Sequence, residues 1–490
     1  MKLEFGMYTG YENAIYEADL RYEQIERTSD IQLPPAINIL LLAIWAMICL
    51  IGFAVIFLGK NTAAGIVIIA VPTFIGMVIK PTFALCIMML VLPTGAGIGA
   101  RGDFSLDRGV GIAVAISFAL NLLITRPRLR IANKALWVIV LYTIWVFLVS
   151  LAAPYLGPEL RRAFTQVQLL ALVFIVYWIL QTNDAKTFRW ALRAYVLGTL
   201  GTITLAFVTG AAIRAIEETP EARYAATLGE VIDANMLAGL TSLAFLAAIY
   251  LFARDKKILW RIVYLAAMLV LPMMLLRIGS RGALIAIAFT ILSPLLFLRQ
   301  VLRRPALAVL ILAVILLASA STGLVVKTGG LESGVTERLT DIHRAKQAVS
   351  YRMVPIKQAI RCAVRKPTGT SYFGWFEHSG LLILPHNDFF FALGLYGIPA
   401  AGLFAFFVIM MMLTVKRTPL GWEKLYARAV LTFLLVMGLN VGQLYQKHFW
   451  VFLAFIMAGE RIATFLTPAT DELVSYTEYE EDLLPQDQLV

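Results

Sequence analysis

Long runs of hydrophobic residues, separated by short polar segments, make up most of this chain. Runs of about 17 to 25 apolar residues, the length needed to cross roughly 30 Å of hydrocarbon, recur between residues 37 and 466. The pattern predicts an all-α polytopic membrane protein with about fourteen membrane-spanning helices, about twelve to fourteen being compatible with it. The predicted ranges are 37–59, 62–79, 82–100, 109–125, 135–153, 167–181, 194–213, 235–253, 258–276, 282–298, 305–325, 388–414, 425–441 and 444–466.

The composition and the chain start support this class. The chain is 60% hydrophobic and 15% charged, whereas about a quarter of the residues of a soluble domain are charged. The first residues lack the basic region and cleavage site of a signal peptide, so we expect the first apolar run to remain in the mature chain. Cys49 and Cys86 lie in apolar runs and Cys362 lies alone in a polar segment. They predict neither a disulfide framework nor a metal-ligand cluster.

Short loops rich in Lys and Arg give the expected orientation, because such loops are retained in the cytoplasm. If every run spans the membrane, the basic loops all fall on one side: 126–134, 186–193, 254–257, 299–304 and 416–424. Both termini are then cytoplasmic. The predicted organisation is a cytoplasmic extension (1–36), eleven spans (37–325), one large exterior loop (326–387), three spans (388–466) and a solvated acidic tail (467–490).

The large exterior loop contains a segment with helical periodicity, VTERLTDIHRAKQAVSYRM, which ends at Met353. Its apolar residues recur at mostly helical spacing: Val335, Leu339, Ile342, Val349 and Met353. This pattern predicts an amphipathic helix on or near the membrane surface. We expect Pro355 to interrupt or kink that helix.

Arginines collect on the exterior side, against the usual bias of short loops. They lie at the ends of spans (Arg161, Arg162, Arg214, Arg223, Arg277 and Arg281) and in the large loop, where Arg352 is one of several. Guanidinium groups bind phosphate bidentately, so the cluster suggests an anionic partner such as a lipid-linked diphosphate. The alternative is that these side chains only snorkel to phospholipid headgroups. Gly279 and Gly282 flank Arg281 and allow close backbone approach, which favours the first interpretation there.

His386 lies where the large loop re-enters the membrane, followed by Asn387 and Asp388. An unperturbed histidine pKa near 6.5 suits proton transfer at neutral pH. The alternative is a hydrogen-bonded interfacial histidine followed by a helix cap, with Asn387 or Asp388 as the capping residue. The other histidines are more weakly placed: His343 and His378 in the loop, and His448 in NVGQLYQKHFW, whose polar residues could face the same cavity.

Familiar motifs of cofactor chemistry do not occur in the sequence. There is no phosphate-binding GxxxxGK[ST], no HExxH and no nucleophile elbow. No Asp-x-Asp pair occurs either, so metal-dependent transfer from a nucleotide sugar has no visible ligands. We therefore expect no cofactor, no metal and no nucleic-acid partner. What remains as candidate chemistry is an exterior histidine, which can act as a base, together with exterior arginines, which can bind an anion.

Four segments, in this order, give the chain a family resemblance: RYAATLGEVIDANMLAG, GSRGALIAIAF, SYRMVPIKQAIRCAVRKPTGTSYFGW and HNDFFFALGLYGIPAAG. They cover roughly residues 220 to 405 and surround one large exterior loop. In this the sequence resembles the O-antigen ligase and polymerase superfamily of bacterial inner-membrane glycosyltransferases.

The resemblance implies an activity and a set of residues. Similar proteins transfer a glycan from undecaprenyl diphosphate to an acceptor hydroxyl on the periplasmic side, without metal or nucleotide and with inversion at the anomeric carbon. Their functional residues correspond here to Arg223 and Arg281, which would hold the diphosphate leaving group, and to His386, which would activate or orient the acceptor hydroxyl. Further expected substrate-binding residues are Arg352, Asn387, Arg161 and Arg162.

The sequence leaves the acceptor open. A ligase would use lipid A core as the acceptor, which we favour slightly, whereas a polymerase of O-antigen or exopolysaccharide would join lipid-linked repeat units. A transporter or flippase of the same lipid-linked glycan is an alternative of another class, and a non-enzymatic assembly subunit that binds headgroups is a further one. Transporters usually show internal repeats and polar residues at the bilayer midplane, whereas the polar residues here concentrate outside the apolar runs.

Overall fold

The computed structural model describes residues 35–57, 62–94, 106–125, 133–183, 185–208, 234–278, 280–292 and 342–466. Regular structure in these ranges is helical throughout, so the all-α class is confirmed for the part of the chain that is described. The helices are α2 (Pro35–Phe57), α3 (Thr62–Ile79), α4 (Pro81–Val91), the 3-10 helix η1 (Leu92–Thr94), α5 (Leu106–Thr125), α6 (Ala135–Leu151), α7 (Leu156–Thr182), α8 (Ala185–Val208), α10 (Ala234–Arg254), α11 (Ile258–Ile278), α12 (Arg281–Leu292), α16 (Ile342–Arg365), α17 (Tyr372–Ser379), α18 (Asp388–Arg417), α19 (Trp422–Asn440) and α20 (Lys447–Leu466).

Thirteen of the predicted apolar ranges coincide with helices, and the remaining one, 305–325, lies outside the described residues. Within the described residues, four helices are long and apolar enough to cross a membrane by themselves: α7, α10, α11 and α18. The largest difference from the prediction is at α7, which begins at Leu156 rather than at residue 167. Its first turns include the polar residues Glu159, Arg161 and Arg162. Hydrophobicity alone therefore misses the polar start of this helix.

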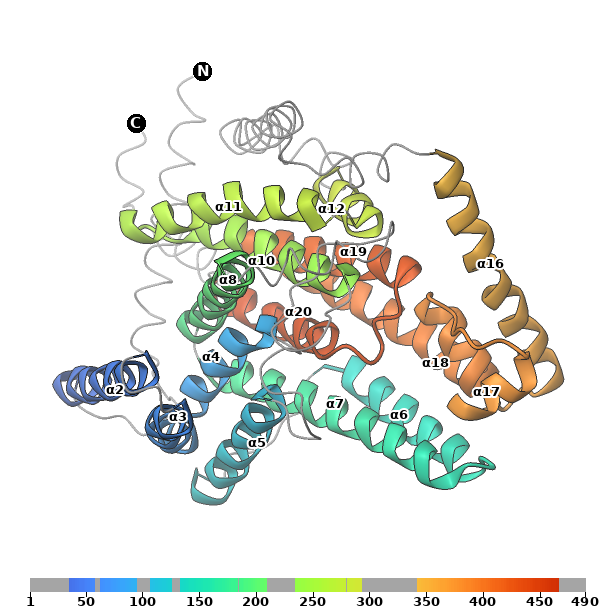
Figure 1. Cartoon of the computed structure of the whole chain (residues 1–490), viewed down its shortest axis with the longest axis horizontal. Coiled ribbons are helices and arrows are strands. Elements are labelled where there is room, and N and C mark those ends of the chain that lie inside the picture. Colours follow the sequence, from blue (N-terminus) through green and yellow to red (C-terminus); the bar gives the residue numbers. More distant parts are fainter. Residues whose placement is uncertain are drawn as a thin grey trace, which may run out of the picture.

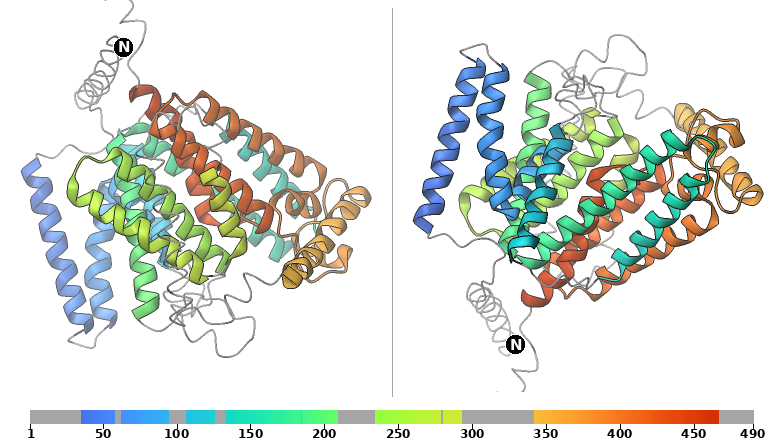
Figure 2. Two further views of the ribbon diagram at one scale, coloured as in Figure 1. Left: turned by 90° about the horizontal axis from the view of Figure 1, so that it is seen from above. Right: turned by 90° about the horizontal axis from the view of Figure 1, so that it is seen from below.

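The helices form one bundle with two distinct edges (Figures 1 and 2). At one edge α2 and α3 pack against each other, and at the other edge α16 and α17 lie beside the start of α18. The centre is occupied by α20 and α10, which bury large side chains such as Trp450, Phe452 and Tyr250. Side chains of α8 complete this core, among them Phe188, whose ring contacts that of Phe455 at 5.0 Å.

The two ends of the bundle are distinguished by which helix termini contact each other there. The loop end is the end that carries residues 366–387, and the helix ends there meet through the contacts described below. At the opposite end, Asn133 Nδ2 donates to Thr414 Oγ1 at 3.1 Å, and Arg254 forms an ion pair with Glu423 at 3.0 Å. The segments 254–257 and 416–424, both predicted to be cytoplasmic, thus lie at the same end of the bundle.

A break in α18 ties the loop end to the bundle. Gly397 has φ 80° and ψ −173°, which interrupts the helical backbone. Here the Ile398 N–H donates to the Pro367 carbonyl at 2.8 Å, and Trp145 Nε1 donates to the Tyr396 carbonyl at 2.7 Å. Groups outside α18 thus provide hydrogen-bond partners for backbone groups that lose their helical partners at the break.

The same tie continues through a second glycine, Gly369, which has φ 105°. The backbone N–H groups of Thr370 and Ser371 both donate to the Leu395 carbonyl, at 2.9 and 2.8 Å. A Cβ at Gly369 would lie 2.6 Å from the Tyr396 carbonyl carbon, so only glycine allows this approach. The segment that precedes α17 is therefore fixed to α18 by main-chain contacts.

The predicted loop helix is present as α16 from Ile342 on, and its earlier part, 335–341, lies outside the described residues. Pro355 does not end it, because the helix continues to Arg365. Ala359 and Cys362 are buried on the side that packs toward α18, whereas Val354 and Val364 are exposed. The helix runs along the outside of the bundle at its edge (Figure 1), which places Arg352 beside the ends of the core helices.

Candidate functional site

The first turn of α18 begins at Asn387, which directly follows His386. Asn387 Oδ1 accepts from the N–H groups of Phe389 and Phe390, at 3.0 and 3.2 Å, so Asn387 is the N-cap of this helix. Its Nδ2 donates to the Leu439 carbonyl at 3.5 Å, at the end of α19. Of the two residues named as possible caps in the alternative interpretation of His386, Asn387 is therefore the one that caps the helix, and its contact with substrate stays a prediction.

The next residue, Asp388, is buried and fastens α18 to the link between α19 and α20. One carboxylate oxygen accepts from the N–H groups of Gln443 and Leu444, at 2.6 and 3.1 Å. The other oxygen faces Gly438, where an added Cβ would lie 2.5 Å from it. Asp388 thereby holds the backbone that carries His386 against the ends of two core helices.

The segments that carry two of the predicted arginines meet at one residue, Asn440, at the C-terminal end of α19. Arg352 Nη1 donates to Asn440 Oδ1 at 3.5 Å. Gly282, which follows Arg281, packs on the same residue, because its added Cβ would lie 3.3 Å from Asn440 Cβ. Asn440 Nδ2 donates to the Val436 carbonyl at 3.0 Å, which keeps the amide oxygen turned toward Arg352. The starts of α12 and α18 and the middle of α16 thus converge on the end of α19.

The sequence segment that contains Arg223 continues to Asn235, which lies in this region. Arg223 itself lies outside the described residues. Asn235, which ends the Asp-Ala-Asn stretch, accepts a hydrogen bond from Ser280 Oγ at 2.9 Å. Ser280 directly precedes Arg281, so Asn235 lies beside the Ser-Arg-Gly segment in space.

Arg161 and Arg162 differ in their surroundings although they are adjacent on α7. Arg161 is exposed. The Arg162 guanidinium lies 3.6 Å from the centre of the Tyr372 ring and 5.6 Å from that of Tyr445, in the range of cation–π interactions. Arg162 therefore faces the start of α17 and the link before α20, whereas Arg161 points away from them.

A buried carboxylate that the sequence did not single out, that of Glu159, lies next to Arg162. Glu159 is fully buried, and its Oε1 accepts from the Phe373 N–H at 2.5 Å. This bond fixes the start of α7 to α17. The Tyr445 hydroxyl, on the far side of the same cluster, shares a hydrogen bond with the Tyr396 hydroxyl at 2.5 Å. Tyr445 connects the Arg162 cluster with α18, since its ring also contacts Phe391 at 5.7 Å.

The histidines are distinguished by their exposure. Three have described side chains, and of these His386 is exposed, His378 is partly buried and His448 is buried. His378 Nδ1 contacts the Gly374 carbonyl at 2.8 Å within α17. His448 Nε2 contacts Gln443 Oε1 at 2.9 Å. The side chain of His343 lies outside the described ones. His386 is thus the described histidine that a bound molecule can reach.

This arrangement joins an exposed imidazole with guanidinium groups at one end of a helix bundle. Its cations suit an anion such as a phosphate, and its imidazole can exchange a proton with a hydroxyl group. Within the described residues, no group of three His, Cys, Asp or Glu side chains could hold a metal ion. Comparison with models of known protein families and with curated proteins gives no match for this chain.

Proposed function

We propose that the protein is a bacterial inner-membrane glycosyltransferase that moves a glycan from undecaprenyl diphosphate to an acceptor hydroxyl, with lipid A core as the acceptor. The observation that carries this proposal is that the start of α12, which carries Arg281, meets Arg352 and the His386–Asn387 segment at Leu439 and Asn440. They include the histidine and two of the four described arginines for which the sequence predicted a role, Arg281 and Arg352. A histidine that only stabilised the fold would not need to be exposed at this point.

The proposal includes an orientation. The loop end faces the periplasm, and both termini lie in the cytoplasm. It is supported by the basic segments 254–257 and 416–424, which meet at the opposite end of the bundle and which the positive-inside rule assigns to the cytoplasm.

In the proposed reaction, the acceptor oxygen forms a bond to the anomeric carbon while the bond from that carbon to the diphosphate oxygen breaks. The leaving undecaprenyl diphosphate keeps the electron pair, and Arg281 and Arg223 stabilise its charge. Arg352, which donates to Asn440, adds a third guanidinium. His386 accepts the proton of the acceptor hydroxyl or orients that hydroxyl, a contribution of roughly 10²–10⁴-fold to the rate. Inversion at the anomeric carbon follows from direct displacement, and the reaction uses neither metal nor cofactor.

Arg162 and Arg161 have lesser roles in this proposal. Arg162, held between two tyrosine rings, is suited to contact the glycan because aromatic rings and a guanidinium offer both stacking and hydrogen bonding. Arg161 is exposed at the same helix start and contacts the acceptor or lipid headgroups.

The deciding experiment is transfer with the purified full-length protein, undecaprenyl-diphosphate-linked glycan and lipid A core. We expect glycan-capped core from the wild type and at least about 100-fold less from His386→Ala, in keeping with the loss of a positioned base. His378→Ala is the matched control, since His378 bonds only within its own helix in the loop, and it should keep its activity. Arg352→Gln should weaken transfer more than Arg365→Gln, an exposed change on the same helix.

Other products would redirect the assignment. A ladder of lengthening carrier-linked glycan without added core identifies a polymerase. If carrier binds but neither product forms, and reconstituted vesicles move the lipid-linked glycan across the bilayer, the protein is a transporter. Equal transfer by His386→Ala and the wild type would remove His386 from the reaction.

A further inference from the structure

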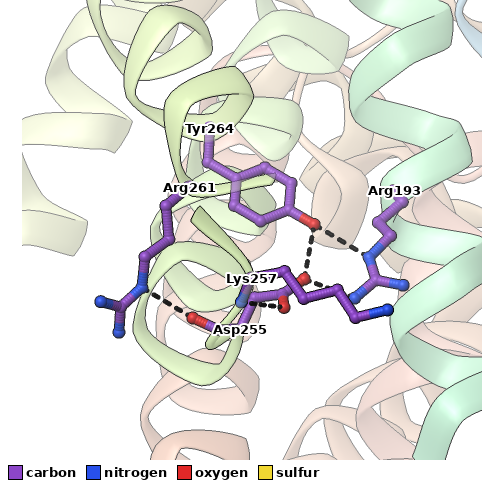
Figure 3. A network of polar contacts seen from close by, with 5 residues as sticks. All are labelled: Arg193, Asp255, Lys257, Arg261 and Tyr264. Carbon is purple, nitrogen blue, oxygen red and sulfur yellow. Dashed lines mark hydrogen bonds and ion pairs between the residues drawn. The ribbon is translucent and has the colours of Figure 1, made fainter. Parts of the chain in front are cut away.

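A second charged cluster lies at the opposite end of the bundle, where α8 meets the turn between α10 and α11 (Figure 3). Arg193 forms an ion pair with Asp255 through Nη2, and its Nε donates to the Tyr264 hydroxyl at 2.9 Å. That hydroxyl donates to Asp255 Oδ2 at 3.2 Å, and the Lys257 N–H donates to Asp255 Oδ1 at 3.2 Å. The buried centre of the cluster is therefore internally paired, and the Asp255 charge is offset by Arg193.

Tryptophan rings extend this cluster toward the surface. Arg193 Cζ lies 4.4 Å from the centre of the Trp190 ring and 5.1 Å from that of Trp260. The two indole rings contact each other edge to face at 5.8 Å. Trp190 is 49% exposed, and indole rings held at a surface in this manner are typical of the membrane–water interface.

The outer part of the cluster is positive. Lys256, Lys257 and Arg261 are all exposed, and Lys186 at the start of α8 is exposed as well. Arg261 is oriented by its Nε, which donates to the Asp255 carbonyl at 2.7 Å and leaves its terminal nitrogens to other groups (Figure 3). Since Asp255 is engaged with Arg193, the charges of these outer side chains are not balanced by it.

An exposed apolar stripe begins directly beside these cations. Along α11, Ile258, Ile262, Leu265 and Leu269 are exposed at helical spacing. Only 28% of the most apolar stretch of α11 is buried in the protein, compared with 78% for its neighbour α10. In a bundle with helices of membrane-spanning length, this stripe is a surface for acyl chains, and its cationic end lies at the level of the headgroups.

We propose that this corner binds an anionic phospholipid, with the headgroup phosphate held by Lys256, Lys257 and Arg261 and the acyl chains lying along α11. The match is one of charge and of position. The cations of the turn and the first residues of α11, the exposed indole of Trp190 on α8 and the exposed apolar stripe along α11 lie together at this corner and match the charged and apolar parts of a phospholipid. The paired Arg193–Asp255 centre holds the turn rigid and contributes no free negative charge against the phosphate.

The test is thermal unfolding of the purified full-length protein in detergent, titrated with phosphatidylglycerol, phosphatidylcholine or inorganic phosphate. A ligand that binds only the folded state raises Tm with concentration. We expect phosphatidylglycerol to raise the Tm of the wild type and the other two additions to have much smaller effects. The triple variant Lys256→Gln, Lys257→Gln, Arg261→Gln should bind phosphatidylglycerol at least about tenfold more weakly, because each basic residue at an anionic surface contributes roughly fivefold.

The matched control removes the same charge elsewhere at this end: Lys134→Gln, Lys416→Gln, Arg417→Gln, all three exposed. It should respond to phosphatidylglycerol as the wild type does. A charge-conserving variant, Lys256→Arg, Lys257→Arg, Arg261→Lys, should also respond and guards against a folding defect in the first triple variant. The proposal is overturned if the neutral triple variant responds like the wild type, if both neutral variants lose the response equally, or if phosphatidylcholine or free phosphate acts as strongly as phosphatidylglycerol.

Discussion

Gly438 is the residue against which the Asp388 carboxylate is seated. An added methyl group would lie 2.5 Å from Asp388 Oδ2, while the other oxygen is held by two backbone N–H groups. The carboxylate cannot move without weakening those bonds, so we expect Gly438→Ala to destabilise the protein by about 1–3 kcal/mol and to lower Tm. Gly459→Ala is the control, because its added Cβ meets nothing within 4 Å. An unchanged Tm for both variants would show that Asp388 is not confined there.

The carboxyl group of Asp255 leads to a prediction about how stability depends on pH. Burial raises the pKa of this carboxyl, but hydrogen bonds from the Lys257 N–H and Arg193, together with the charge of Arg193, outweigh burial and leave the pKa below its usual value. A carboxyl with a lowered folded-state pKa adds stability above its unfolded pKa of about 3.9, and that stability is lost as pH falls through the folded value.

We therefore expect the Tm of Asp255→Asn to lie below that of the wild type at neutral pH, because Arg193 is left buried without its counter-ion. The gap should shrink as pH falls below about 4, where the wild-type carboxylate also loses its charge. Thermal unfolding followed from pH 7 to about pH 3 measures this. A gap that stays constant over the whole range would mean that the ion pair is not what Asp255 contributes.

At the scale of single residues, the sequence was informative where a charge stands at the edge of an apolar run. Such a group is costly in hydrocarbon, and this singled out Arg281 and His386, whose segments the structure brings to the end of α19. The amide of Asn440 and the buried Glu159 carry no such signal. Both lie in polar stretches next to helix ends, and their importance comes from the approach of α12, α16 and α17, which no local pattern records.

At the scale of elements, the break in α18 is the most specific feature. A Cβ at Gly397 would lie 2.2 Å from the Pro367 carbonyl oxygen, and the φ of 80° is unfavourable for alanine. We expect Gly397→Ala to destabilise the protein by about 2–5 kcal/mol, the combined cost of backbone strain and overpacking. Gly402→Ala on the same helix has open space around its Cβ and should leave Tm nearly unchanged. Comparable Tm values for the two variants would contradict this account of the break.

Helix positions followed well from the sequence because an apolar run of sufficient length has few alternatives to a helix in a membrane. The early start of α7 did not follow from the sequence, since Glu159, Arg161 and Arg162 extend the helix beyond its hydrophobic part. The break at Gly397 did not either. A glycine in an apolar run has many uses, and this one depends on a main-chain partner, Pro367, that belongs to a separate segment.

At the scale of the whole molecule, the two ends of the bundle lead to a labelling prediction. Under the proposed orientation, a cysteine at Leu382, which is 92% exposed at the loop end, should react with a membrane-impermeant maleimide in cells whose outer membrane is permeabilised. A cysteine at Leu420, exposed between α18 and α19 at the opposite end, should react only after the inner membrane is opened.

The native cysteines provide a low background for this measurement. Cys362 is buried, and burial raises the pKa of its thiol even though Arg365 and Lys366 act in the other direction. Replacing Cys49 and Cys86 by serine removes the remaining thiols. The reverse labelling pattern would place the loop end in the cytoplasm and exclude the proposed periplasmic reaction.

The neighbours of each helix within the bundle were beyond the sequence. Helices that are apolar all round give no preferred direction for packing, so nothing local indicates that α4 lies against α8 or that α7 lies against α20. The two ends, in contrast, agree with the predicted alternation of basic loops where the structure describes them, since segments 254–257 and 416–424 lie together.

The tie between residues 367–371 and α18 also has an evolutionary consequence. It is made by carbonyl and N–H groups, and among its members Gly369 and Gly397 are restricted in residue type by their backbone and close contacts, and Ser371 by its φ of 68°. Side chains elsewhere in this part of the chain can therefore diversify without moving the frame that holds the start of α18. Under the proposed function, a lineage that encounters new polysaccharides can alter what it accepts by changing such side chains, and it inherits the position of its histidine unchanged.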